Sequence, residues 1–281
     1  MKEWDFRINY GIKTGLNEVF IVDTATKDWL CKEDPKNEEI LKPVLRGRDI
    51  KRYGCDWADL WLIFIPWHFP LHQDTSIVGV SQRAESEFRK RYPVMYNYLL
   101  RSKAPLSKRN IAETGIRYEW YALQRCAATY YADFEKEKIV WPRLTRIHKS
   151  EDTSFPRFSM AEKNTFIIDS LCFITGSQIR YLIAILNSSY AAYYFHQNIA
   201  ILDNGGMQMR QQYIENVPIP QINPVNQPLV LKIELLATQI MADKKKNTKA
   251  DTSTLERQVD YLVYKLYGLT EEEIAVVEGR K

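Results

Sequence analysis

Short apolar runs in this chain are each ended by a proline or a glycine, and this pattern limits what it can fold into. The runs are Leu60–Ile65 before Pro66, Lys138–Trp141 before Pro142, and Thr165–Thr175 before Gly176. Runs of this kind predict β-strands, and proline ends them because it has no N–H for the ladder. The third run is long enough for one long strand or two short ones. Short strands mixed irregularly with helical segments predict an α+β fold and not a repeating βαβ pattern.

A further strand is predicted at Asn17–Asp23. The residues before it, Gly11 to Gly15, predict a flexible turn that exposes backbone amides and the ammonium group of Lys13. Ser81–Leu100 predicts a polar helix rich in Arg and Tyr. Ser177 is a suitable N-cap for a helix through about Phe195. Because this helix is apolar on most sides, we expect it to be buried.

The C-terminal part of the chain, after about Asn223, has a different pattern. Apolar residues recur at helical spacing in two stripes, which are Leu229, Ile233, Leu236, Ile240 and then Leu255, Val259, Leu262, Leu266. Capping boxes at Ser253/Glu256 and Thr270/Glu273 mark two helix starts, and Gly268 is a suitable stop. The sequence therefore predicts one domain over 1–222 and a second unit over 223–281, an antiparallel helical hairpin plus a short terminal helix.

Composition points to a protein of the cytoplasm without membrane segments. No run of about 18 apolar residues is present, and the N-terminus lacks the apolar core of a signal peptide. The four cysteines form no CxxC pair, so we expect free thiols. His68 and His72 are four residues apart, but Pro70 between them rules out the helix that this zinc-binding spacing requires. We therefore expect no metal site.

The formal net charge of +4 conceals strong local clustering. Residues 42–52 hold five cations against one acid, and residues 83–109 hold eight cations against two acids. Acidic residues gather elsewhere, for example Glu271, Glu272 and Glu273. Clustered Lys and Arg suit phosphates, because neutralising phosphates releases bound counterions. Arg and Gln among aromatic residues at 117–125 and 141–146 suit base edges, since Arg can read guanine and Gln can read adenine.

Enzymatic patterns are weak in this chain. It has no Walker A, GxGxxG, GxSxG or HExxH motif, and it lacks the (N/D)PP(Y/F) tetrapeptide of amino-methyltransferases. Asp49-Ile50-Lys51 has the D-x-K form of some nucleases, but no well-placed upstream carboxylate accompanies it. We assign no catalytic, cofactor-binding or metal-binding residue, and whether the parent protein is an enzyme stays open.

Seven segments, in order, resemble the TaqI-like C-terminal specificity domain of adenine-specific DNA methyltransferases and type IIG restriction-modification enzymes. They are residues 11–20 (GIKTGLNEVF), 45–50 (LRGRDI), 120–121 (WY), 138–142 (KIVWP), 184–188 (AILNS), 213–220 (YIENVPIP) and 263–274 (VYKLYGLTEEEI). The resemblance implies a target-recognition domain with irregular, double β-helix-like winding of short strands and a closing α-hairpin. It also implies a methyltransferase domain that holds S-adenosylmethionine and flips adenine. That domain has no counterpart here, so we expect it in cis, this polypeptide being a cut-out piece, or in trans as a separate chain.

Three hypotheses follow. The first is a sequence-specific module for double-stranded DNA, in which the loop 203–212 enters a groove because Gly205 and Gly206 permit close backbone approach. Its expected phosphate contacts are Lys13, Arg46, Arg48, Lys51, Arg52 and Arg109. Its expected base contacts are Arg117, Gln124, Arg125, Arg143, Arg146, Gln208 and Arg210. The second hypothesis is a compact metal-dependent nuclease. The third is a protein-interaction remnant that only docks a methyltransferase.

Overall fold

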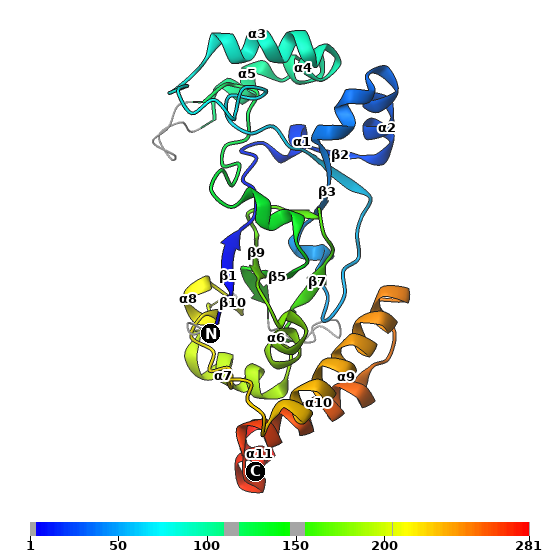
Figure 1. Cartoon of the computed structure of the whole chain (residues 1–281), viewed down its shortest axis with the longest axis vertical. Helices are drawn as coiled ribbons and strands as arrows, with labels where there is room; N and C mark the ends of the chain where they lie inside the picture. The colour runs from blue at the N-terminus through cyan, green and yellow to red at the C-terminus, as the bar shows by residue number, and fades with distance from the viewer. Residues whose placement is uncertain (1–3, 110–117, 147–154, 204, 281) are drawn as a thin grey trace.

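The computed structural model describes residues 4–109, 118–146, 155–203 and 205–280 (Figure 1). The molecule is elongated, with helices at both ends and sheets between them. None of the helices in these ranges is long and apolar enough to cross a membrane.

The central sheet has the order β1-β9-β5-β7 and is antiparallel throughout. Its strands are β1 (Arg7–Tyr10), β5 (Lys138–Pro142), β7 (Ser159–Ala161) and β9 (Leu171–Thr175). The predicted strand at Lys138–Trp141 is confirmed. Strands β5 and β9 are completely buried, which explains why they read as continuous apolar runs and not as alternating ones.

A second sheet has the order β2-β4-β3-β8. Its strands are β2 (Ile21–Asp23), β3 (Leu41–Leu45), β4 (Leu60–Ile63) and β8 (Phe166–Ile167). The predicted strand at Leu60–Ile65 is confirmed for its first four residues. The predicted run 165–175 is two strands, β8 and β9, and the turn between them joins the two sheets.

The predicted strand Asn17–Asp23 is wrong in its first half. Residues Asn17–Phe20 form a helical turn, α1, before β2. The hydroxyl of Thr14 accepts a bond from the Leu16 N–H and donates to the Asn17 side chain, and these local bonds start the turn. The turn buries Val19 and Phe20 together, which an extended strand with alternating faces would not do.

Helices pack at the end of the molecule beside this second sheet. They are α2 (Thr24–Glu33), α3 (Gln82–Arg91), α4 (Pro93–Leu100) and α5 (Lys103–Ser107), with the 3-10 turn η1 (Pro35–Ile40). Two further 3-10 turns, η2 (Gly47–Asp49) and η3 (Tyr131–Glu135), lie nearer the central sheet. The predicted helix 81–100 is capped by Ser81, as its sequence suggests, and divided before Pro93, where α4 starts.

The other end holds the C-terminal helices. They are α6 (Ile179–Leu186), α7 (Ser189–Asn198), α8 (Gln211–Ile214), α9 (Gln227–Lys246), α10 (Ser253–Tyr267) and α11 (Glu271–Val277). The predicted helix 177–195 is two helices, because Asn187 ends α6 and Ser188 caps α7. Ser177 does not cap α6; its hydroxyl donates to Asp5. The expected burial is confirmed for α6, with Arg180 its one position that is not buried, but it is wrong for α7, in which only Ala191 and Phe195 are buried.

Helices α9 and α10 lie side by side as the expected hairpin (Figure 1). Gly268 ends α10 in the left-handed conformation, and Thr270 and Glu273 form the predicted capping box. The hairpin packs on α6 and shares one hydrophobic core with α6, α7 and one side of the central sheet. The mixed helix and sheet composition agrees with an α+β fold, while the double β-helix-like winding stays a prediction.

Candidate nucleic-acid interface

Several of the predicted contact residues meet at the turn between β8 and β9. The backbone N–H of Arg143 donates to the carbonyl of Ser170 at 2.9 Å, and its Nη1 donates to the carbonyl of Asp169 at 3.0 Å. Its guanidinium carbon lies 5.2 Å from the ring centroid of Tyr10, at the end of β1. Arg143 is exposed although its position is held by these contacts. The turn therefore presents a pre-oriented cation at the surface.

Lys13 and Arg125 lie next to the same turn. Their backbones form an antiparallel bridge, with N–H to O distances of 3.1 and 2.9 Å. The preceding residue, Ile12, accepts a bond from Asp169 at 2.9 Å. A Cβ at Gly11 would lie 2.1 Å from the carbonyl oxygen of Ile168, so only glycine permits this close approach. The sequence motif around Gly11 thus fixes Lys13 and Arg125 beside Asp169.

Arg48 completes this cluster. It lies in η2, and the preceding Gly47 would place a Cβ 3.8 Å from the Ser170 hydroxyl. The parallel pairing of β3 with β8 brings these two loops together. We call Lys13, Arg48, Arg125 and Arg143 the turn cluster. Four cations close together on one surface make a favourable site for phosphate groups.

Two other predicted residues support the turn cluster from inside. Arg109 is buried, and its guanidinium donates to the carbonyls of Thr14, Leu106 and Trp120. Burial lowers its pKa from the ordinary value. Gln124 is also buried, and both side chains pack against Gly15. Arg109 was expected at a phosphate and Gln124 at a base edge. The structure places both beneath the Lys13 loop, so neither enters our proposed surface.

The remaining phosphate candidates are held by acidic partners. Arg46 binds Asp49 through Nε and Nη2, at 3.1 and 2.9 Å. Arg52 pairs with Glu256 on α10 and donates to the carbonyl of Pro156. Lys51 lies 3.9 Å from Asp56. Arg52 in particular joins the basic segment to the helical hairpin, and its side chain is only 12% exposed. We therefore read Arg46 and Arg52 as structural.

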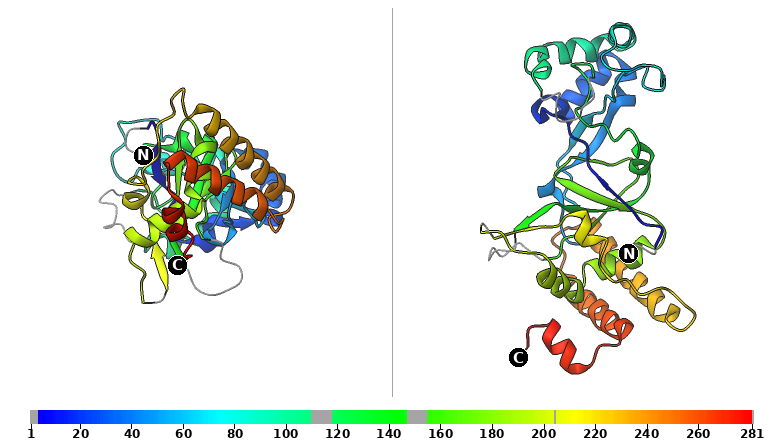
Figure 2. Two further views of the ribbon diagram at one scale, coloured as in Figure 1. Left: turned by 90° about the horizontal axis from the view of Figure 1, so that it is seen from below. Right: turned by 90° about the vertical axis from the view of Figure 1, so that its left-hand side faces the viewer.

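A two-stranded ribbon stands beside the turn cluster. It consists of β6 (Leu144–Arg146) and β10 (Gly206–Gln208), paired antiparallel, and Figure 2 shows the β10 segment extending away from the body of the molecule. Trp141 anchors its base by donating to the carbonyl of Met209 at 2.8 Å, and Met209 donates its N–H to Arg143. Strand β6 directly follows Arg143, so the ribbon and the turn cluster form one surface.

The ribbon carries most of the other base candidates. Gln208 is half-buried and Arg210 is exposed, while Arg146 lies opposite Gly206 in the register. The expected loop 203–212 is partly wrong, because Gly206–Gln208 is strand and Gln211–Ile214 is the short helix α8. Gly205 has a φ of +72° in the tight turn before the strand, where glycine is favoured. Arg117 lies outside the described residues.

Sequence reasoning missed Tyr10 and Leu144 in this surface. Tyr10 is 39% exposed and stacks with Arg143, although its segment shows only a short alternating run. Burial raises the pKa of the neighbouring Tyr130, and Arg125 opposes this rise. Leu144 is 48% exposed next to Arg143. The one available signal for Leu144 was its adjacency to Arg143, and Tyr10 had no such signal, since exposure is not visible in the sequence.

The basic segment 83–109 lies apart from this surface. Its helices α3, α4 and α5 form the end of the molecule opposite the hairpin (Figure 1). Several of its cations pair with acids, namely Arg83 with Asp74, Arg91 with Glu87 and Lys103 with Glu85. Its local charge is thus partly neutralised by Glu85 and Glu87, which the residue count included, and by Asp74, which lies outside the counted segment.

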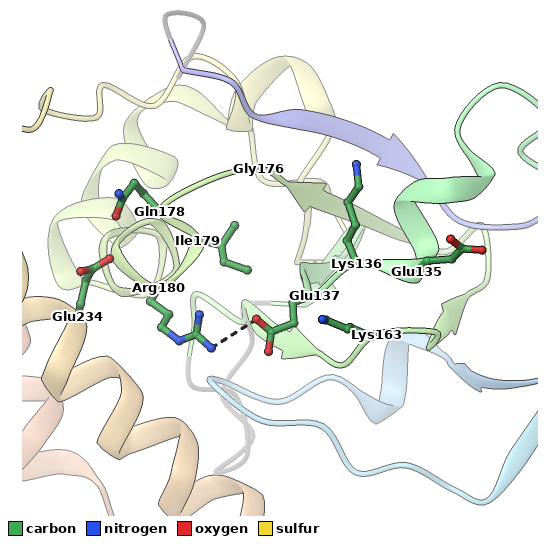
Figure 3. Close-up of a pocket in the computed structure, with 9 residues that line it drawn as sticks. All are labelled: Glu135, Lys136, Glu137, Lys163, Gly176, Gln178, Ile179, Arg180 and Glu234. Carbon is green, nitrogen blue, oxygen red and sulfur yellow. Dashed lines mark hydrogen bonds and ion pairs between the residues drawn. The ribbon is translucent and has the colours of Figure 1, made fainter.

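A pocket of about 490 Å³ lies beside β5 and the start of α6 (Figure 3). Three cations and three acids line it, and they are Lys136, Lys163, Arg180, Glu135, Glu137 and Glu234. Arg180 and Glu137 pair at 3.4 Å. The pocket does not fit S-adenosylmethionine, because Ile179 is its one apolar side chain and an adenine ring needs an apolar slot.

The described ranges contain no group of three or more His, Cys, Asp or Glu side chains arranged to hold a metal ion. Asp49, the carboxylate of the D-x-K pattern, is buried and accepts three N–H groups of Arg46. The four cysteines are free thiols, as expected.

The fold and the basic surface can be compared with known proteins. A type II methyltransferase, M.MjaIV of Methanocaldococcus jannaschii, is 23% identical over 265 residues, which cover 92% of this chain and 77% of the relative. The structure of the type IIL restriction-modification enzyme MmeI in complex with DNA gives a TM-score of 0.61 at 16% identity, covering 95% of this chain. The type IIG restriction endonuclease BpuSI gives 0.49 at 14% identity, also over 95%. The chain spans about a third of the length of these two enzymes, 34% and 31%.

The class of the protein follows from a family model, which places it among the specificity domains of restriction-modification enzymes. The model of the TaqI-like C-terminal specificity domain matches residues 42–219, well over half of the chain. The chain therefore belongs to this family, as its motifs indicated.

Proposed function

We propose that the chain is the sequence-specific double-stranded DNA recognition module of a DNA methyltransferase or restriction-modification enzyme. One observation carries the proposal: Lys13, Arg48, Arg125 and Arg143 gather at the β8–β9 turn, beside a projecting ribbon with Gln208 and Arg210. Cations of this kind bind phosphates and set the register on the duplex, and base edges supply specificity. A two-stranded ribbon is narrow enough to enter the major groove.

The turn cluster and the ribbon have different roles in this proposal. Arg48 and Lys13 neutralise phosphates, while Gln208, Arg210, Arg143 and Arg146 face base edges. Arg109 and Gln124 hold the Lys13 loop from below. Burial supports the separation of the inner residues from the surface, because Arg109 and Gln124 are buried whereas Arg48, Arg143 and Arg210 are exposed.

We further propose that the catalytic reaction is adenine-specific methylation and that a methyltransferase domain, in cis or in trans, performs it. That domain would hold S-adenosylmethionine as the methyl donor. The family and the type II methyltransferase relative support this part of the proposal. The helical hairpin, joined to the basic segment through Arg52 and Glu256, would brace the recognition surface.

The decisive experiment is selection of binding sites from a random duplex pool at 50 and 200 mM salt. The full chain is used alone and with the methyltransferase domain of a family member added. Enrichment of one motif, with binding that weakens steeply as salt increases, is expected. Recovery of a random pool with no enrichment under either condition would refute sequence-specific recognition.

The two alternatives give other results in the same assay. A protein-interaction remnant retains no duplex at any salt concentration but forms a complex with the methyltransferase domain. A nuclease nicks the pool when Mg²⁺ is added, and Asp49→Asn should then abolish nicking.

A further inference from the structure

The ribbon has one inner and one outer face, and its outer face carries an unusual pair of side chains. Thr145 and Met207 oppose each other in the register and are both buried. Since side chains alternate along a strand, the next opposed pair, Leu144 and Gln208, lies on the other face. Leu144 is 48% exposed and Gln208 is half-buried.

Contacts within the described part of the protein leave both side chains of this pair partly available. The side-chain amide of Gln208 makes no hydrogen bond within the described part of the chain, while its backbone carbonyl accepts from Arg210. Half of the Leu144 surface remains open to solvent on a strand that could have carried a polar residue. Opposed residues on paired strands have Cβ atoms about 5 Å apart, so the amide and the isobutyl group stand next to each other.

This combination matches one base pair. In the major groove adenine offers the N7 acceptor and the N6 donor, which an amide can bind with two hydrogen bonds. The paired thymine offers its C5-methyl group, which prefers an apolar contact. A guanine-cytosine pair offers two adjacent acceptors and a donor with no methyl group, so the leucine would have no partner.

The surroundings of the pair suit DNA and not an apolar protein partner. Arg143 precedes Leu144, Arg210 follows two residues after Gln208, and both are exposed. The acidic residues Asp203, in the turn before β10, and Asp169, next to Arg143, offset part of this charge. Positive charge on both sides of the amide and the leucine attracts an anionic polymer such as DNA.

We propose that Gln208 and Leu144 together read one A·T base pair in the major groove, Gln208 on the adenine and Leu144 on the thymine methyl group. This inference rests on the proposed function and adds to it the identity of one base pair in the recognised sequence. Arg143 and Arg210 orient the ribbon on the flanking backbone or bases.

The test combines variants with base analogues. Sites are first selected from a random duplex pool with the wild-type chain, Gln208→Ala and Leu144→Ala. Both variants should lose the preference at the same position, and the wild type should require A·T there. Gln227→Ala and Leu235→Ala, at exposed positions of α9, are the matched controls and should select the wild-type motif.

The selected duplex is then synthesised with one altered base at that position. Uracil in place of thymine removes the methyl group and should weaken wild-type binding about four-fold. It should have no effect on Leu144→Ala. Adenine with carbon in place of N7 should weaken wild-type binding about five-fold or more and have no effect on Gln208→Ala.

The outcomes separate this inference from the function on which it rests. If the wild type selects a motif but the Gln208 and Leu144 variants lose affinity equally for cognate and random duplexes, the two side chains contact phosphates. This outcome would overturn the inference and leave the proposed function standing. The inference is also overturned if neither base analogue weakens wild-type binding at any A·T position of the selected motif. This outcome does not depend on any variant. A wild type with no motif at all would refute the proposed function together with the inference.

Discussion

Arg143 stacks on Tyr10 with its guanidinium carbon 5.2 Å from the ring centroid, and this contact joins the start of the ribbon to the first strand of the central sheet. One η nitrogen also donates to the Asp169 carbonyl. Stacking and one hydrogen bond restrict the arginine to one orientation while most of its donors stay available. Such pre-organisation reduces the entropy lost on binding.

Replacing Tyr10 should therefore weaken recognition through Arg143. Tyr10→Ala removes the ring and should lower cognate binding about two- to five-fold, as expected for one cation–π contact. Tyr10→Phe keeps the ring and should bind as the wild type does. Arg143→Ala should relax the preference at one position of a selected motif, and Tyr10→Ala should add little to it. Full additivity of the two substitutions would show that Tyr10 acts independently of Arg143.

Arg48 should contribute affinity without sequence preference. It is exposed, and the residue before it, Gly47, lies next to Ser170 of the β8–β9 turn. Arg48→Ala should weaken cognate and random duplexes by the same factor and reduce the slope of log K against log salt by about one. Fluorescence anisotropy titrations at several salt concentrations measure both quantities. A loss confined to the cognate duplex would assign Arg48 to a base instead.

Arg52 should affect stability and not DNA binding, because it pairs with Glu256 and both side chains are largely buried. Arg52→Ala or Glu256→Ala alone should lower the free energy of unfolding by about 1–3 kcal/mol, since each leaves a charge without its partner. The double variant should lower the free energy of unfolding by less than the sum of the two single variants. Denaturant unfolding measures this coupling, and the salt dependence of DNA binding should match the wild type. A smaller slope of log K against log salt for Arg52→Ala would show instead that Arg52 contacts a phosphate.

Gly11 and Gly47 provide a matched pair of substitutions. A Cβ at position 11 would collide with the backbone of Ile168, whereas one at position 47 meets its nearest atom at 3.8 Å. Gly11→Ala should destabilise the chain by at least 3 kcal/mol or displace the Lys13 loop. Gly47→Ala should change stability by less than about 1 kcal/mol. Thermal unfolding of both variants tests this, and equal effects would contradict the close approach seen at Gly11.

The sequence predicted elements better than it predicted contacts. Strands β5 and β9 were visible because continuous apolar runs ended at Pro142 and Gly176, and the helix end at Gly268 was visible because its capping pattern is local. The sequence could not distinguish the exposed Arg48 from the arginines that have partners inside the protein, which are Arg46, Arg52 and Arg109. A charged residue is read as exposed by default, and its burial depends on partners such as Glu256 that lie far along the chain. Tyr10 and Leu144 entered the surface only through the pairing of distant strands.

Lys138 should make the stability of the chain increase with pH. It lies within the central sheet with no exposed surface, and its ammonium group donates to the carbonyls of Lys136 and Glu162. Burial lowers its pKa from 10.5 to about 8, against the opposing effect of Cys55 and Glu137. Between pH 8 and 10.5 the unfolded chain therefore binds more protons at this residue than the folded chain does.

A group with this difference contributes stability that grows as pH rises from 8 toward 10.5. The wild-type free energy of unfolding should increase by about 1–3 kcal/mol over this range relative to Lys138→Met, which cannot titrate. The comparison with the methionine variant is essential, because buried tyrosines such as Tyr53, whose pKa burial raises, favour unfolding as pH passes 10. Urea unfolding at pH 7.5, 8.5 and 9.5 gives the difference at each pH. A constant difference between the two proteins would mean that Lys138 stays charged in the folded sheet throughout.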